Sequence, residues 1–394
     1  MNDGGVQSGS RDGSIEPDGG ETESESTSRG LATVLTRRRL TVAGTLLVLL
    51  GLAVALRELD IGTVVAQVSS ADPRLLGAAV AVYAVSWPLR GRRYRDVLAA
   101  MDHRSDTLVA TAAVFVSQTA NLAIPARAGD AARAHVMRTR RNVPYAAGFA
   151  SLAVERVFDL ATIAVLAGLA TAWLALGGAA GPLEAAFSSD GARTAALAAA
   201  AVSATTAGVG LAVVTSARAN HGLGARLRSR VAGRPRLEGA LEAGLRFAGD
   251  VQTVARRPRA LGRIGVGSLL VWSLDVLTAV LVLAALGSGL AFATLVTVGT
   301  LAVSVGNLAK VLPLSQGGVG LYEAAFTALI VGLTPIGAST ALAAAIVDHA
   351  LKNGVTLVGG AGAVAALGVS LSDATGSTPE TTRETGSVLG EPKR

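Results

Sequence analysis

Long apolar runs separated by short polar segments dominate the pattern along this chain. Several of these runs reach or exceed about 18 residues, the length that a helix needs to cross the hydrocarbon core of a bilayer. Nine runs can be traced, at residues 40–56, 75–89, 107–125, 145–176, 194–215, 264–286, 291–313, 321–333 and 336–367. The pattern predicts an all-α, polytopic membrane helix bundle with about six to eight transmembrane helices.

The composition agrees with a membrane protein and excludes several kinds of site. Of the 394 residues, 51% are hydrophobic and 16% are charged, whereas roughly 25% of the residues in a soluble domain are charged. The chain has no cysteine, which excludes disulfides, iron–sulfur clusters and thiolate zinc sites, and its four histidines lie far apart in the sequence. We therefore expect no metal site and no cofactor.

The two ends of the chain differ from its middle. Residues 1–36 and 370–394 are rich in Gly, Ser, Thr and acidic residues and hold almost no apolar surface to bury, so we expect two disordered tails. Residues 37–369 are expected to form the transmembrane domain, whose charge is strongly basic and nearly all arginine. In a membrane protein this favours loops that face anionic lipid, and we expect no nucleic-acid partner.

The arginine-rich segments set an orientation for the bundle. They are residues 37–39, 90–104, 127–141 and 218–263. The positive-inside rule places these segments, and with them both tails, in the cytoplasm of a multi-pass cell-membrane protein. All of them fall on one side if residues 107–141 form a re-entrant hairpin from the cytoplasmic side and residues 291–333 a matching hairpin from the outside. Because the run at 107–125 is 19 residues long, a tilted full crossing is the alternative.

One motif recurs in the two halves of the chain. Asn121 begins Asn-Leu-Ala-Ile-Pro and Asn307 begins Asn-Leu-Ala-Lys-Val-Leu-Pro, and in both copies a glycine follows the proline four residues later. The offset of 186 residues indicates repeat halves at about 75–176 and 264–367, which the orientation above makes inverted copies. Inverted repeats with interrupted helices point to a transport site near the bilayer midplane. Chance similarity between stretches rich in Ala, Gly and Leu is the alternative.

The segments around the two prolines supply a first set of candidate lipid-headgroup residues. Proline and glycine interrupt a helix, so each break should end one helix and begin another, whose N-terminus carries free N–H groups and partial positive charge. Two such N-termini suit an anionic headgroup, and Arg127 adds a bidentate fork for phosphate. A juxtamembrane arginine, and close helix packing by the glycines, are the alternatives. The set is Asn121, Arg127, Gly129, Asp130, Arg133, Asn307, Gly317, Gly318 and Gly320.

Ionisable residues inside the apolar runs supply a second set. Such residues are costly in lipid and usually face a cavity or a charged partner. On a helix, Glu155 and Asp159 share one face beside Arg156, which favours a functional group. Asp348 and Lys352 have the spacing to neutralise each other, either as a packing device or as part of a site.

Two further carboxylates belong to this second set. Asp275 falls at the centre of its apolar run and has no partner nearby in the sequence, so we expect a functional role for it. Glu323 lies in the first turn of an expected helix, where a carboxylate complements the helix dipole.

Three groups of residues, in this order along the chain, resemble a known family. They are Asn121 to Pro125 with Arg127, Gly129, Asp130 and Arg133, then Glu155, Arg156 and Asp159, then Leu312 and Pro313 with Gly317, Gly318, Gly320 and Glu323. They are similar to the transmembrane region of the lysylphosphatidylglycerol synthases and its stand-alone, flippase-like relatives. The resemblance covers about residues 40–368, and it departs at Ser315-Gln316, where the family commonly has proline before the glycine pair.

The resemblance implies a domain that moves lipid between leaflets. In some members of the family this domain is fused to a soluble aminoacyl-transferase domain. The longest hydrophilic stretch of this chain, residues 216–263, is too short for such a domain. The resemblance therefore implies the transporter part alone.

Three functions are compatible with these observations. The first is a translocase for an anionic or glycosylated lipid, with anionic or polyprenyl-linked membrane lipids as partners. The second is a membrane-embedded transferase that acts on a phospholipid or a polyprenyl phosphate, and the third is a non-catalytic partner of such an enzyme. Because the sequence has no DxD, HExxH, P-loop or nucleophile-elbow motif, we expect the translocase.

Overall fold

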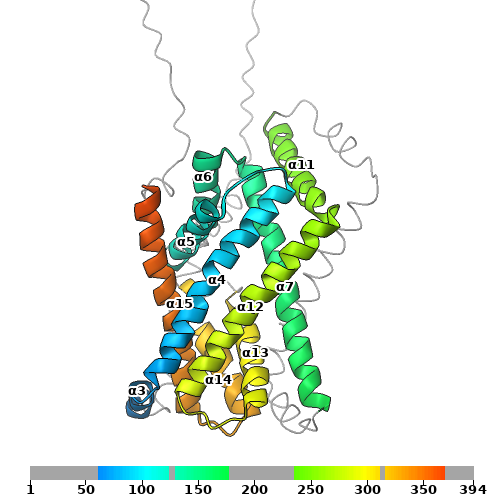
Figure 1. The fold of residues 1–394 in the computed structure, drawn as a ribbon. Helices are drawn as coiled ribbons and strands as arrows, with labels where there is room; N and C mark the ends of the chain where they lie inside the picture. Colours follow the sequence, from blue (N-terminus) through cyan, green and yellow to red (C-terminus); the bar gives the residue numbers. More distant parts are fainter. Residues whose placement is uncertain (1–60, 124–128, 177–234, 311–315, 369–394) are drawn as a thin grey trace, which may run out of the picture.

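The computed structural model describes residues 61–123, 129–176, 235–310 and 316–368 (Figure 1). Within these ranges every regular element is a helix, which confirms the all-α class. The elements are α3 (Ile61–Ser69), α4 (Pro73–Ala100), α5 (Thr107–Ala123), α6 (Gly129–Arg141), α7 (Tyr145–Leu176), α11 (Pro235–Ala255), α12 (Pro258–Ala285), α13 (Phe292–Ala309), the short 3₁₀ helix η2 (Gln316–Gly318), α14 (Leu321–Leu333) and α15 (Ala338–Leu367). Both expected tails and the apolar runs at 40–56 and 194–215 lie outside the described residues.

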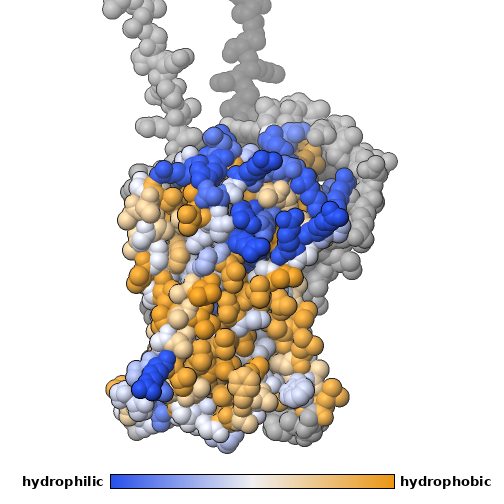
Figure 2. Space-filling model, in the orientation of Figure 1, coloured by the Kyte–Doolittle hydropathy of each residue, from blue (hydrophilic) through white to orange (hydrophobic). Residues whose placement is uncertain are grey.

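The described helices form a membrane bundle. Helices α7, α12, α13 and α15 are long and apolar enough to cross a membrane. Helix α4 has the same 28-residue length as α12 but carries four arginines toward its end, while α5 and α14 are shorter apolar helices of 17 and 13 residues. Figure 2 shows an apolar band across the middle of the molecule, with a strongly hydrophilic surface at the end where α4 finishes.

The helices of the two halves match in order and in length. Helices α4 and α12 both have 28 residues, α5 and α13 have 17 and 18, α6 and α14 both have 13, and α7 and α15 have 32 and 30. The starts of the paired helices are offset by 185 to 193 residues. The repeat that the sequence motif indicates therefore extends over a set of four helices in each half of the chain.

The second set is inverted relative to the first. The N–H of Asp72, just before α4, donates to the carbonyl of Ala285 at the end of α12, with an N–O distance of 2.9 Å. At the opposite end of the pair, Arg257 lies just before α12 and its Nη1 is 3.5 Å from the carbonyl oxygen of Ala99 near the end of α4. Helices α4 and α12 therefore run antiparallel along each other.

The α5–α6 pair turns back instead of crossing. Arg141 at the end of α6 forms a salt bridge with Asp106, which immediately precedes α5. The entry and exit of this hairpin thus lie side by side at one end of the bundle. Figure 1 shows α13 and α14 toward the other end, which is the arrangement that the opposed re-entrant hairpins predict.

The two hairpins meet inside the bundle. Gly317 in η2 has a φ of +65° that glycine adopts without strain, and a Cβ added there would lie 3.0 Å from Cδ2 of Leu122 near the end of α5. The prolines of the two motifs fall in segments 124–128 and 311–315, outside the described residues. What the structure places together is therefore the end of α5 and the turn that precedes α14.

Candidate functional site

Arg93 is the centre of a first group of buried charges. It lies on α4, is 6% exposed, and donates from Nη1 to Oδ1 of Asp159 at 2.5 Å and to Oγ of Ser268 at 2.7 Å. Its Nε lies 3.5 Å from Oε1 of Glu155. Trp272 donates its indole N–H to the same Asp159 oxygen at 2.9 Å. One arginine thus joins α4, α7 and α12.

Arg133 on α6 completes this group, which we call the Arg93 cluster (Arg93, Arg133, Glu155 and Asp159). Arg133 forms a salt bridge with Oε2 of Glu155, and its guanidinium carbon lies 3.4 Å from the centre of the Tyr94 ring. Arg133 and Glu155 are both 4% exposed. Two arginines and two carboxylates balance each other, which offsets part of the cost of burying them.

Lys352 on α15 is the centre of a second group. Its Nζ lies 2.9 Å from Oδ2 of Asp348 and 3.1 Å from Oδ2 of Asp275. The hydroxyl of Tyr322 donates to Oδ2 of Asp348 at 2.5 Å, and Nη2 of Arg90 lies 3.6 Å from Oδ1 of Asp275. The expected Asp348–Lys352 pair forms, and the same lysine neutralises Asp275, which has no partner nearby in the sequence.

Glu323 and His349 extend this second group toward the start of α14. Oε2 of Glu323 accepts a hydrogen bond from the N–H of Gly320 at 2.7 Å, which caps the helix as its position predicts. Its other oxygen lies 2.6 Å from Nδ1 of His349. Nζ of Lys310 lies 4.1 Å from the centre of the Tyr322 ring.

We call this group the Lys352 cluster, and it too is balanced. With a neutral histidine it contains three cations and three carboxylates, which are Arg90, Lys310 and Lys352 with Asp275, Glu323 and Asp348.

Both clusters line the contact between α4 and α12. Arg90 and Arg93 are one turn apart on α4, and Ser268, Trp272 and Asp275 recur at about one-turn spacing on the facing side of α12. We call the two clusters together the polar seam. It consists of two neighbouring groups of ionic contacts inside a bundle whose surface is apolar at mid-height (Figure 2). In the described part of the chain, no group of three or more His, Asp or Glu side chains could hold a metal ion.

The break between α5 and α6 is held by hydrogen bonds of its own residues. The N–H of Gly129 donates to Oδ1 of Asn121 at 2.9 Å, and Nδ2 of Asn121 donates to Oδ1 of Asp130 at 3.2 Å. A Cβ on Gly129 would lie 1.9 Å from the carbonyl oxygen of Ser117. Close packing thus explains this glycine, and Asn121 already satisfies one N–H in the first turn of α6.

The comparison with known proteins assigns the chain to a family. A model described as the lysylphosphatidylglycerol synthase TM region matches residues 41–360. The chain belongs to this family. The match includes both helix breaks and every residue of the polar seam, so it confirms the resemblance that the motifs indicate.

A relative from Haloferax volcanii, named Glycosyltransferase AglD, is 47% identical over 353 residues. The match covers 86% of this chain and 56% of the relative. The chain thus spans just over half the length of that relative, and the relative's name describes the longer protein.

The described candidate residues of this family member that are not part of the seam are Asn121, Gly129, Asp130, Arg156, Asn307, Gly317, Gly318 and Gly320. Arg127 falls in segment 124–128, outside the described residues. Arg156 is half-buried, and among the residues that the structure describes it forms no salt bridge within the Arg93 cluster. The side-chain amide of Asn307 donates to the carbonyl of Val303 in its own helix at 2.9 Å.

Three cations of the seam, Arg90, Arg93 and Lys310, are not among the sequence candidates. Neither are Trp272, Tyr322 and His349, whose side chains contact its carboxylates. The positive-inside rule assigns the arginine-rich segment 90–104, and with it both arginines, to the cytoplasmic side, but α4 continues to Ala100 and carries both along the α12 contact. Their one-turn spacing is the signal that could have placed them on a shared helix face.

Proposed function

We propose that the protein is a lipid translocase that moves a lipid with an anionic or glycosylated headgroup between the leaflets of the cell membrane. The observation that carries this proposal is the polar seam, a charge-balanced set of buried ions between two inverted sets of helices. Intramembrane ions usually face a cavity, a pathway or one another. Inverted repeats with interrupted helices are a common transporter architecture, in which the site lies where the halves meet.

Arg90 is the cation of the seam that can change its partner at least cost. Its side chain is 18% exposed, and its guanidinium lies 3.6 Å from Asp275. Asp275 has a closer partner in Lys352 at 3.1 Å, so it keeps one cation within salt-bridge distance when Arg90 moves away. An incoming phosphate can therefore take the guanidinium fork of Arg90 without leaving a buried carboxylate unpaired.

The opposed hairpins supply the rest of the mechanism. In inverted-repeat transporters one half rocks against the other, which exposes the same site to each side in turn. Contact between Leu122 and Gly317 brings the two hairpins together beside the seam. The proposal includes Arg127 as a ligand of the lipid phosphate. It also includes a cytoplasmic position for the arginine-rich end of the bundle.

Replacement of Arg90 tests the proposal in vesicles that carry fluorescent phosphatidylglycerol or polyprenyl-phosphate lipids in one leaflet. We expect Arg90→Gln to slow their appearance in the other leaflet about tenfold or more, because a hydrogen bond to a charged group contributes about 1.5–3 kcal/mol. Arg92→Gln is the matched control, because Arg92 is exposed on the same helix. This variant should transport the lipids at the rate of the unaltered protein. In the same assay, Arg127→Ala tests whether the guanidinium of Arg127 also binds the lipid phosphate.

Equal transfer rates for Arg90→Gln and the unaltered protein would contradict the proposal. Failure of the folded, unaltered protein to move any of these lipids would favour the second candidate, a membrane transferase or its non-catalytic partner. The similarity to a protein named a glycosyltransferase supports that candidate. Turnover of a polyprenyl-linked sugar donor by the purified chain in detergent would establish the transferase.

A further inference from the structure

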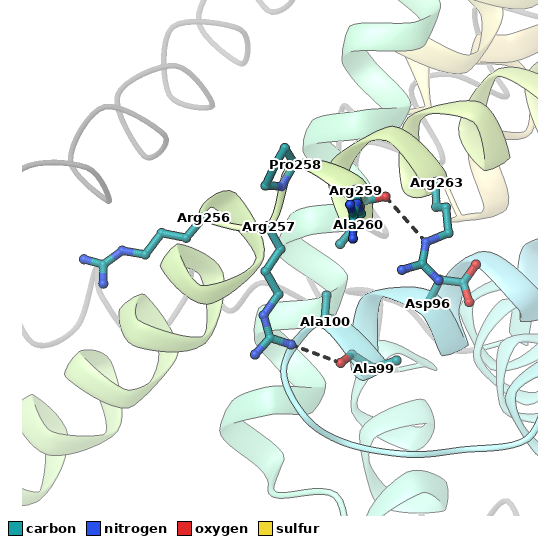
Figure 3. Close-up of a pocket in the computed structure, with 9 residues that line it drawn as sticks. All are labelled: Asp96, Ala99, Ala100, Arg256, Arg257, Pro258, Arg259, Ala260 and Arg263. Atoms are coloured by element: carbon teal, nitrogen blue, oxygen red, sulfur yellow. Dashed lines mark hydrogen bonds between the residues drawn. The ribbon is translucent and has the colours of Figure 1, made fainter.

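A second polar site lies at the arginine-rich end of the bundle, outside the polar seam. A cleft of about 560 Å³ opens where α11 turns into α12, against the end of α4 (Figure 3). Small side chains leave this space open, because Ala99, Ala100 and Ala260 line it. The charged residues of the lining are Asp96, Arg256, Arg257, Arg259 and Arg263.

The carboxylates near this cleft are already engaged. Oδ1 of Asp96 accepts a hydrogen bond from the guanidinium of the preceding residue at 2.7 Å, and Asp102 accepts two from Arg257 at 3.0 and 2.8 Å. The hydrogen bond from Arg257 lowers the pKa of Asp102, so that this carboxyl stays ionised and paired. Over the described ranges Arg259 and Arg263 form no salt bridge, and both are exposed. The cleft therefore presents an excess of positive charge.

The cleft lies at the level that lipid headgroups occupy. The stretch of α12 that is long and apolar enough to cross a membrane begins at Pro258, which is part of the cleft lining. Figure 2 shows the hydrophilic surface of this end directly beside the apolar band. About one to two turns beyond Arg263 on α12, Val266, Leu269 and Leu270 are 58%, 44% and 48% exposed. An apolar strip thus leads away from the arginines into the hydrocarbon region.

We propose that this cleft binds the phosphate of an anionic membrane lipid. Arg259 and Arg263 hold the phosphate oxygens, because guanidinium groups pair with phosphate as planar forks, and basic pockets between helices at a membrane surface suit such headgroups. The acyl chains lie along the exposed residues of α12. A free phosphate ion offers the arginines the same chemistry, but it makes no use of the apolar strip.

Native mass spectrometry of the purified full chain tests this site by titration with phosphatidylglycerol, phosphatidylcholine and inorganic phosphate. We expect Arg259→Gln with Arg263→Gln to weaken phosphatidylglycerol binding about 30-fold, from about 1 kcal/mol for each arginine near an anionic surface. Arg104→Gln with Arg138→Gln is the matched control. It removes the same charge from two exposed arginines near this end of the bundle but outside the cleft, and should leave binding unchanged.

Three results would overturn the proposal. They are unchanged affinity in the cleft variant, equal weakening in both double variants, and binding of inorganic phosphate with no preference for phosphatidylglycerol over phosphatidylcholine. Size-exclusion chromatography and thermal unfolding check that both double variants are folded, which we expect because all four side chains are exposed. Because lipid binding is measured without transport, the result for this site does not depend on whether the protein is a translocase.

Discussion

At the scale of single residues, the buried ions make this bundle depend on specific pairs. Arg93 neutralises both Glu155 and Asp159, but the two carboxylates differ in what remains without it. Glu155 keeps its salt bridge with Arg133, whereas Asp159 keeps the indole hydrogen bond of Trp272 and the electrostatic attraction of Arg156 but no described salt bridge. Removal of Arg93 therefore leaves Asp159 without a salt-bridge partner, whereas Glu155 keeps one.

We predict that Arg93→Met destabilises the protein by about 3–5 kcal/mol, because it leaves Asp159, whose side chain is only 13% exposed, without its salt-bridge partner. Adding Asp159→Asn should recover at least half of that loss, since a neutral amide can still accept the hydrogen bond from Trp272 and no charge is left unpaired. Thermal unfolding in detergent measures both. A double variant no more stable than Arg93→Met would show that the ion pair is not the source of the loss.

At the scale of helices, close packing between α5 and α6 stabilises their hairpin. Salt bridges allow α4 to pack inside the bundle although it carries arginines. Helix α4 matches the 28 residues of α12 although it carries Arg90 and Arg93, because carboxylates on α7 and α12 neutralise both. Helices α5 and α6 can approach each other because Gly129 has no side chain to meet the backbone of Ser117. The same feature makes the hairpin sensitive to one added methyl group.

We predict that Gly129→Ala destabilises the protein by about 1–3 kcal/mol or more, since its Cβ would meet a backbone oxygen that cannot rotate away. Gly168→Ala in α7 is the control, because a Cβ there has no neighbour within 4 Å and alanine favours a helix by about 1 kcal/mol over glycine. The apparent melting temperatures of the two variants should move in opposite directions or differ clearly. Equal values would contradict the packing argument.

At the scale of the whole molecule, the inversion of the two halves fixes which ends of the helices share a membrane face. The start of α4 meets the end of α12, and the end of α4 meets the start of α12. The chain has no cysteine, so a single introduced thiol reports on its own position. This makes the topology directly measurable in intact cells.

We predict that an impermeant maleimide added outside cells labels Arg74→Cys and Ser288→Cys but neither Arg104→Cys nor Arg138→Cys. The first two lie at the poorly basic end of the bundle and the last two at the arginine-rich end, which the positive-inside rule places in the cytoplasm. Permeabilised cells should show labelling of all four. Labelling of Arg104→Cys together with Ser288→Cys in intact cells would contradict the inverted arrangement.

The sequence by itself determined the all-α membrane class, the two helix breaks and the family. It also indicated the repeat, because hydropathy, helix-breaking prolines and a recurring motif are local properties of the chain. It found the carboxylates of the seam, since an acid in an apolar run is visible without knowledge of its partner. It also placed the Asp348–Lys352 pair, whose members lie one turn apart.

Only the tertiary structure decided which cation meets which carboxylate. Arg93 pairs with Asp159, 66 positions away, and with Ser268, 175 positions away, and such partners depend on which helix faces pack together. The arginine-rich end of α4 looks like a loop in the sequence, because charge compensation from α7 and α12 is absent from its local pattern. The cleft at the start of α12 could likewise not be predicted from the sequence, because it forms only where the end of α4 packs against the turn between α11 and α12.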